Sequence, residues 1–172
     1  MTTVSLTSLF SRHIGDPKPG DGFASTARTI TETDVVSFAA LTGDWHPQHI
    51  DRVWAKRSVF GQRIAHGMLV ASYATALVPL DPYRVVALRA VETTFKRPVR
   101  IGDTIHVEGE CTKVTELDES YLLVDSMWRV VNQANEVVVR MKVRVVWRTE
   151  RGRDELESEA EESDAFGGGP FL

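Results

Sequence analysis

The sequence predicts an α+β domain in which a curved antiparallel sheet wraps around one long buried helix. Residues 84–148 read as successive strands, since they are rich in Val, Ile, Thr and aromatic residues. Residues 65–78 are apolar nearly all round, which is typical of a helix enclosed on all sides. Long antiparallel strands with one apolar face need a cover, and this helix supplies it.

The segment before this helix is expected to hold one strand and two short helices. Residues 23–30 follow a lead-in rich in Pro, Gly and Asp and form the first expected strand. A helix is expected over 32–42, because Thr31 offers a hydroxyl cap, acids follow in the first turn, and Gly43 is a stop signal. Pro47 then bends residues 44–51 into a loop, and Asp51 can cap the next short helix.

The central helix and the sheet account for most of the remaining chain. The helix over 65–78 is expected to end at Pro79 and Pro82. Expected strands cover residues 85–95, 104–117, 121–131 and 136–148, with turns at 118–119 and 132–135 and a break between Pro98 and Gly102. In the last strand Val137, Val139, Met141, Val143 and Val145 point one way, while Val138, Arg140, Lys142, Arg144 and Val146 point the other.

Length and charge predict one domain with an acidic tail. A chain of 172 residues suits one sizeable core. Its net charge of −4 is unevenly placed, because residues 151–172 carry seven acids and two arginines, whereas residues 1–150 carry 18 basic and 17 acidic residues. We therefore expect a single domain over 1–150 and a disordered, Gly-rich tail over 151–172, with no nucleic-acid surface.

The chain is expected to work in a reducing cytoplasm. Cys111 is its only cysteine, the first 14 residues lack the pattern of a secretion signal, and the apolar run at 64–80 is too short and too polar to span a membrane. The sequence also lacks a dinucleotide-binding glycine motif, a phosphate loop, a nucleophile elbow and a C-x-x-C pair. Nucleotide-dependent and serine-hydrolase chemistry therefore has no support.

Ionisable residues concentrate in one stretch, residues 44–51, with His66 following. Three interpretations remain open. Asp44 and Asp51 can act simply as helix caps beside surface histidines. His46 and His49 can ligate a metal, although Pro47 between them removes the shared helical face. Asp44 and His49 can also converge across the bent loop, hold one water and exchange its protons near neutral pH.

Three stretches carry a resemblance to a known family. They are residues 38–51 (FAALTGDWHPQHID), 60–69 (FGQRIAHGML) and 94–103 (TFKRPVRIGD). Together they resemble the MaoC-like, (R)-specific enoyl-CoA hydratase family, over about residues 15–148. The resemblance implies the hot-dog fold, a long helix enclosed by an antiparallel sheet.

The resemblance also implies the site. Asp44 and His49 match the catalytic pair that activates water, and Gly67 matches the glycine whose amide polarises the thioester carbonyl. That role is physically reasonable in the first turn of a helix, where amides are unpaired. Thr75 matches a supporting hydroxyl. Arg63, Lys96, Arg97 and Arg100 flank the motifs and are candidates to meet the phosphates of coenzyme A or a phosphopantetheine arm.

One position departs from the family pattern. His46 stands where the family usually has Asn, and Trp45 adds bulk beside it, so both are expected to shape substrate binding. His66 belongs to the helix motif and is expected to be a buried structural histidine. His13, His106 and Cys111 have no partners in the sequence and are expected to be structural or solvent-facing.

The expected function is that of a hydro-lyase that hydrates trans-2-enoyl thioesters to (3R)-hydroxyacyl thioesters and catalyses the reverse dehydration. The resemblance implies an acyl-CoA or acyl carrier protein thioester as substrate, no metal, no separate cofactor, and a homodimer or higher homo-oligomer. Two alternatives stay open, namely a thioesterase on the same fold and a non-catalytic subunit that depends on a partner.

Overall fold

The computed structural model describes residues 15–78, 81, 83–152, 154 and 158. Its sheet has the strand order β1-β4-β5-β6-β3, all antiparallel, with β2 pairing against β4. The strands are β1 (Gly22–Ala24), β2 (Arg28–Thr29), β3 (Val85–Phe95), β4 (Thr104–Glu116), β5 (Tyr121–Asn132) and β6 (Val137–Arg148). The helices are α1 (Glu32–Thr42), α2 (Pro47–Ile50), α3 (Arg52–Ala55) and α4 (Gly67–Leu77).

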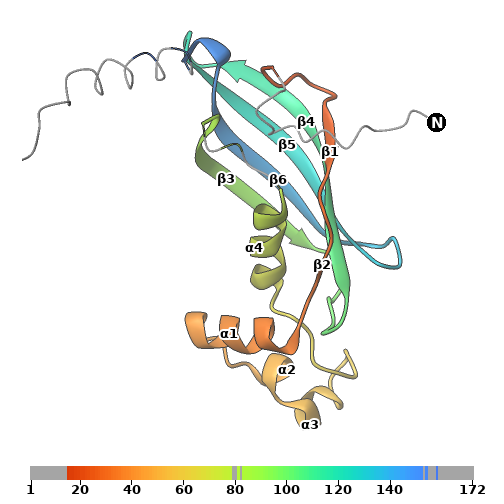
Figure 1. Cartoon of the computed structure of the whole chain (residues 1–172). Helices are drawn as coiled ribbons and strands as arrows, with labels where there is room; N and C mark the ends of the chain where they lie inside the picture. Colours follow the sequence, from red (N-terminus) through yellow and green to blue (C-terminus); the bar gives the residue numbers. More distant parts are fainter. Residues whose placement is uncertain (1–14, 79–80, 82, 153, 155–157, 159–172) are drawn as a thin grey trace, which may run out of the picture.

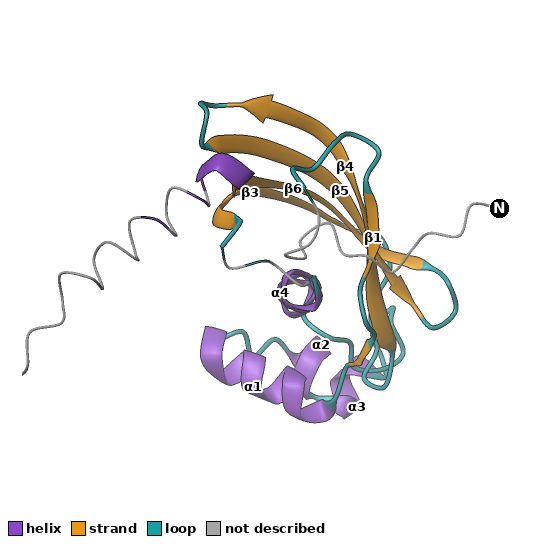
Figure 2. Ribbon diagram, turned by 45° about the horizontal axis from the view of Figure 1, so that its top comes forward, coloured by secondary structure: helices purple, strands orange, loops and turns teal. Residues whose placement is uncertain are grey.

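The predicted architecture is confirmed. Figure 2 shows the curved sheet arching over α4, with α1 on the opposite side of that helix. Figure 1 shows α1, α2 and α3 gathered at one end of α4. The inner face of the sheet packs Trp128, Met141 and Trp147 into one core with Leu69 and Val70 of α4. This burial of large apolar side chains fixes the helix within the sheet.

The helix predicted over 32–42 begins and ends as expected. The Thr31 hydroxyl accepts a hydrogen bond from the Asp34 amide, and the Asp34 carboxylate accepts one from the Thr31 amide. The two bonds form a complete capping box. Gly43 closes the helix with φ of 77°, a backbone conformation that favours glycine. The turn residue Asn135 also has positive φ, between β5 and β6. Local capping and turn chemistry therefore account for these boundaries.

The first strand differs from the prediction, because residues 23–30 form two short strands separated at Ser25. The Ser25 hydroxyl accepts the amide of Val107, and the Ser25 amide donates to the Val107 carbonyl. A side-chain oxygen thus replaces a backbone carbonyl in the ladder with β4, which interrupts regular pairing.

The last strand contains a bulge. Val138 is fully buried, although alternation places it with the polar residues. The β5–β6 register shifts here, since Val130 pairs with Val139 while Val131 pairs with Val137. Val138 is therefore the extra residue of a β-bulge. Its carbonyl accepts two successive amides, from Lys96 and Arg97.

Helix α4 is not enclosed on all sides within one chain, contrary to the prediction. Met68, Ser72 and Ala76 lie one turn apart and are exposed, and the Met68 side chain is 58% exposed. The predicted stops at Pro79 and Pro82 lie outside the described residues, as do most residues of the predicted acidic tail. Within the described part, no helix is both long and apolar enough to cross a membrane.

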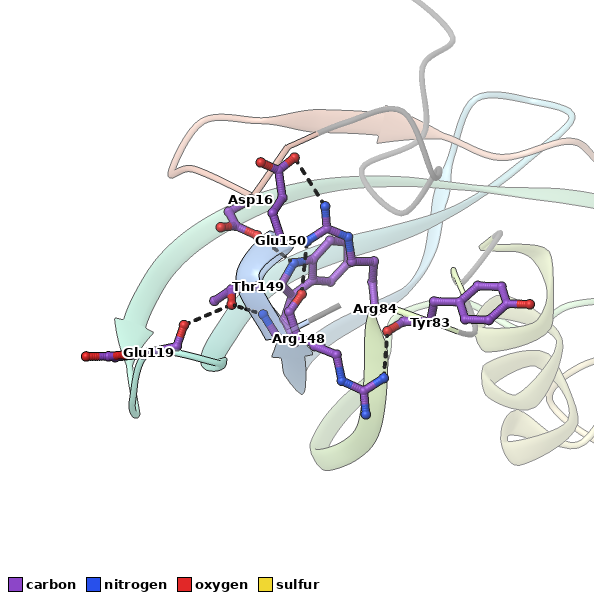
Figure 3. A network of polar contacts seen from close by, with 9 residues as sticks. Asp16, Tyr83, Arg84, Glu119, Arg148, Thr149 and Glu150 are labelled. Carbon is purple, nitrogen blue, oxygen red and sulfur yellow. Dashed lines mark hydrogen bonds and ion pairs between the residues drawn. The ribbon is translucent and has the colours of Figure 1, made fainter. Parts of the chain in front are cut away.

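A buried arginine ties the far end of the sheet together (Figure 3). The Arg84 guanidinium, 1% exposed, donates to Asp16 at 3.1 Å, to the Arg148 carbonyl at 3.1 Å and to Glu150 at 3.3 Å. The indole of Trp147 donates to the same Asp16 carboxylate at 3.3 Å. The Arg84 guanidinium therefore holds together the start of the described chain, the start of β3 and the end of β6.

Candidate functional site

A largely apolar cavity lies at the N-terminal end of α4, against α1, α2 and the end of β3. Its volume is about 640 Å³, which falls in the range of small-molecule sites. Its apolar lining includes Phe38, Phe60, Ile64, Val70, Phe95 and Val99. The three predicted catalytic residues, Asp44, His49 and Gly67, also line it. The structure therefore brings together residues from three separate segments.

The segment between α1 and α3 is more regular than the predicted loop. Pro47 occupies the first position of the short helix α2, where its missing amide costs nothing. His46 caps this helix, because its Nδ1 atom accepts the Gln48 amide at 3.2 Å. Capping a helix is a task that Asn side chains also perform well. Asp51 caps α3 as predicted, through the amides of Val53 and Trp54.

His49 is buried and held in one tautomer. Its Nδ1 lies 2.8 Å from the Ile64 carbonyl, which only accepts, so Nδ1 carries the hydrogen. Nε2 then presents its lone pair and lies 3.0 Å from the side-chain nitrogen of Gln48. Burial lowers the pKa of His49 below its ordinary value near 6.5, the neighbouring imidazoles lower it further, and the Ile64 carbonyl and Asp44 oppose this. The ring is thereby kept as a neutral base.

Asp44 lies beside His49 and faces solvent. Its carboxylate accepts the His46 amide at 3.3 Å, and its own amide donates to the Thr42 hydroxyl at 3.3 Å. Ligating atoms of Asp44, His49 and His66 all lie within 4.8 Å of one another. A carboxylate and a neutral imidazole at this separation can share one water molecule.

The geometry of the two buried histidines favours acid–base chemistry over metal ligation. The rings of His49 and His66 are stacked, with centroids 3.8 Å apart and planes inclined by 26°. A metal ion lies close to the plane of each imidazole that binds it, at about 2.0–2.1 Å for zinc. Two nearly parallel planes at this spacing meet only well beyond that distance. His46, the other histidine considered for a metal, uses its Nδ1 atom as a helix cap.

Gly67 is the first residue of α4, so its amide has no partner within the helix. A glycine also suits this position for reasons of space. A Cβ atom at this position would lie 2.8 Å from the ring of Phe95 at the end of β3. Phe95 therefore packs directly on the backbone that carries the amide. A ligand carbonyl at this helix end would meet both the amide and the positive end of the helix dipole.

The remaining predicted binding residues divide into two groups. Lys96 and Arg97 line the cavity, and Arg97 forms an ion pair with Glu136 at 3.6 Å. The other five, Arg100 among them, do not line it. Arg63 forms a bidentate pair with Glu32, Thr75 donates to the Ser72 carbonyl within α4, Trp45 is 50% exposed, and His46 caps α2.

Among the lining residues that were not singled out from the sequence, two act directly on His49 and Gly67. Gln48 contacts Nε2 of His49, and Phe95 covers Gly67. Their roles depend on contacts between segments that sequence spacing does not show. Cys111 is buried in the core, where burial raises the pKa of its thiol, and His106 lies 3.5 Å from Glu108 on β4. His13 lies outside the described residues.

Comparison with known proteins identifies a family. Residues 16–126 match the sequence model described as a MaoC like domain. The chain is 38% identical over 105 residues to the (R)-specific enoyl-CoA hydratase of Rhodospirillum rubrum, covering 59% of this chain and 71% of that one. It is also 38% identical over 108 residues to Protein MaoC of Klebsiella aerogenes, covering 62% of this chain but only 32% of that protein.

Solved structures agree with these relatives. The structure titled monoamine oxidase regulatory protein from Archaeoglobus fulgidus superposes with a TM-score of 0.73 at 36% identity, covering 77% of this chain and 91% of that one. A Mycobacterium tuberculosis protein described as a double hotdog fold matches with a TM-score of 0.69 at 16% identity, covering 77% of this chain and 43% of that one. The second match shows the fold alone. The chain has the hot-dog fold, as predicted.

Proposed function

Because this chain belongs to the MaoC-like dehydratase family, we propose that it catalyses the reversible hydration of trans-2-enoyl thioesters to (3R)-hydroxyacyl thioesters. The observation that carries the proposal is the convergence of Asp44, His49 and the Gly67 amide on one apolar cavity. Relatives named as (R)-specific enoyl-CoA hydratases and a 3-hydroxybutyryl-CoA dehydratase support the same reaction class.

The proposed chemistry uses each group for one task. A water molecule displaces the Gln48 amide from Nε2 of His49 and binds between Nε2 and the Asp44 carboxylate. Its oxygen adds to C3 of the enoyl group, while the pair takes up its proton. Negative charge develops on the thioester oxygen, where the Gly67 amide and the α4 dipole stabilise it. The proton then passes to C2, so one water is added and no external acid is consumed.

The lining indicates how a thioester would be held. The phenyl rings and aliphatic side chains of the cavity suit an acyl chain. Lys96 and Arg97 lie at the same cavity and suit the phosphates of coenzyme A or of a phosphopantetheine arm. The proposed reaction is a proton transfer with addition of water, so it calls for no cofactor besides the carrier of the substrate.

We further propose that the chain works as a homodimer. Strand β3 is the last in the sheet and pairs only with β6 among the described strands. Its outer backbone groups have no strand partner among the described residues, and its residues Leu88 and Val91 are exposed and apolar, a combination that natural proteins normally cover. On α4, Met68 adds a second exposed apolar side chain. A second copy placed edge to edge would cover both and extend the sheet.

An assay with crotonyl-CoA and longer enoyl-CoAs tests the reaction. Loss of absorbance of the conjugated thioester, with appearance of the (3R)-hydroxyacyl product by chiral chromatography, is the expected result. A thiol-trapping reagent run in parallel detects free CoA. Release of CoA without hydration would contradict the proposal and indicate a thioesterase.

A further inference from the structure

His66 connects two segments of the proposed site that are far apart in the sequence. It is 2% exposed and directly precedes Gly67 at the start of α4. Its Nε2 lies 3.0 Å from the backbone carbonyl of Asp44. Because a carbonyl only accepts, Nε2 carries the hydrogen and donates it. The hydrogen bond therefore joins the residue of the acid–base pair to the residue beside the polarising amide.

Asp44 has few other restraints. Its two other hydrogen bonds within the described residues are both 3.3 Å long, and its side chain is exposed. His49, in contrast, is buried and already fixed through both ring nitrogens, by the Ile64 carbonyl and by Gln48. The hydrogen bond from His66 is therefore a main restraint on the position of Asp44, whereas His49 is held by other contacts.

The Nδ1 atom of His66, which makes no hydrogen bond among the described residues, indicates more than a structural role. Its Nδ1 is buried and has no hydrogen-bond partner in the described part of the chain. Buried polar groups that serve only the fold are nearly always paired. The ring instead stacks on His49 and lies 5.0 Å from the ring of Phe38, so its single polar anchor is the Asp44 carbonyl.

We propose that His66 is a positioning residue that sets the separation between the Asp44 carboxylate and the Gly67 amide. The inference rests on the proposed function, because these two groups act on opposite parts of one substrate. Water must reach C3 while the thioester oxygen meets the Gly67 amide. The covalent structure of the substrate fixes the distance between C3 and that oxygen. A displacement of about 1 Å in such an arrangement costs on the order of 10²-fold in rate.

Two substitutions separate the hydrogen bond from the stacking. His66→Gln keeps an N–H donor near the position of Nε2 but removes the ring, whereas His66→Phe keeps a ring but removes the donor. Val107→Ala is the matched control, because Val107 is fully buried on β4 and does not line the cavity. It reports what loss of core packing alone does to activity. Steady-state kinetics on an enoyl-CoA and thermal unfolding are measured for all four proteins.

The expected result is a fall in kcat of about 10²-fold for His66→Phe with KM changed less than threefold. His66→Gln is expected to retain kcat within about fivefold of wild type, and Val107→Ala to retain kcat despite a lower Tm. Wild-type kcat in His66→Phe would overturn the proposal. Equal losses in both His66 variants would also overturn it, since the donor would then be irrelevant.

A second measurement does not depend on activity. Nitrogen-15 spectra of the imidazoles report the tautomer, and Nε2 of His66 is expected to carry the hydrogen while Nδ1 does not. The opposite tautomer would overturn the positioning proposal. A wild-type protein that shows the expected tautomer but hydrates no enoyl thioester would overturn the proposed function and leave the hydrogen bond established.

Discussion

The imidazole of His49 donates its Nδ1 hydrogen to the backbone carbonyl of Ile64 at 2.8 Å. This bond links α2 to the segment that leads into α4, and it decides which ring nitrogen faces the substrate. Nε2 is left as the basic atom, on the same cavity as Asp44. The chemistry of the site therefore depends on a backbone contact made 15 residues along the chain.

Loss of either member of the pair is expected to abolish most activity. Asp44→Asn and His49→Ala should each lower kcat for hydration by about 10²–10⁴-fold, because each removes a group that takes part in proton transfer. Enoyl-CoA hydration is measured spectrophotometrically. Asp51→Asn is the control, since Asn also caps helices and Asp51 does not line the cavity. Activity that survives both site substitutions would contradict the assignment.

The pH profile should reflect the burial of His49. Its pKa is lowered from 6.5, chiefly by burial, and the neutral ring is the active base. The value of kcat/KM should therefore be flat above pH 6.5 and fall on the acid side only below it. Because the folded protein binds this proton less readily than the unfolded chain, stability should also decline as the pH falls through 6.5. An acid limb centred above pH 7 would contradict the role of His49.

Gly67→Ala is expected to lower kcat by about 10²-fold, although an alanine keeps the backbone amide. The added Cβ would meet the ring of Phe95 at 2.8 Å, so the ring, the start of α4 or the strand end must shift. Adding Phe95→Leu removes the ring atoms that cause this clash and should recover part of the loss. A double variant as slow as Gly67→Ala would show that the clash is not the cause.

The exposed edge of the sheet predicts the oligomeric state. Leu88, 55% exposed on β3, lies on the proposed dimer edge. Leu88→Arg should convert the dimer to a monomer, measured by size-exclusion chromatography with light scattering, because a charge in that contact stays unpaired. Glu116→Arg, an exposed residue at the end of β4, is the control and should leave the dimer intact. A monomeric wild type with full activity would contradict the dimer.

The Asp34 carboxylate near the start of α1 should make the free energy of unfolding depend on pH in acid. Burial tends to raise the pKa of Asp34, but hydrogen bonds from Tyr73, Thr31 and Arg28 prevail and lower it to about 2. The carboxylate therefore contributes stability above pH 3.8, the ordinary value, and this contribution is lost as the pH falls toward 2. Asp34→Asn should lower stability by about 1–2 kcal/mol at pH 7 in urea unfolding, with the difference shrinking below pH 4. A constant difference from pH 7 to pH 2 would contradict this role.

Most of the fold follows from local sequence signals. Cap residues such as Thr31 and Gly43 act on backbone groups a few positions away, so the bounds of α1 could be predicted. Alternation likewise places Met141 and Val143 inside the sheet. Contacts between distant segments are different in kind. The bulge at Val138 and the break at Ser25 arise from register with a neighbouring strand, and no local pattern encodes them.

The candidate site shows the same division. Asp44, His49 and Gly67 stand in recognisable motifs, and the structure places all three at one cavity. The contact of Gln48 with His49 and that of His66 with Asp44 depend on how α2 meets the start of α4. Arg63 lies in a motif too, but Glu32 engages its guanidinium. Sequence proximity to a motif thus did not decide which cations reach the cavity.

The Arg84 cluster has a consequence for synthesis on the ribosome. Its guanidinium joins Asp16, near the beginning of the described chain, to Glu150, near its end. The ion-pair cluster of Asp16, Arg84 and Glu150 therefore cannot be completed until residue 150 has emerged, long after β1 and α1 have been made. Early strands must wait in a partly open state, in which nonlocal pairing is still missing. Closure of the domain is in this sense a late event that one buried cation completes.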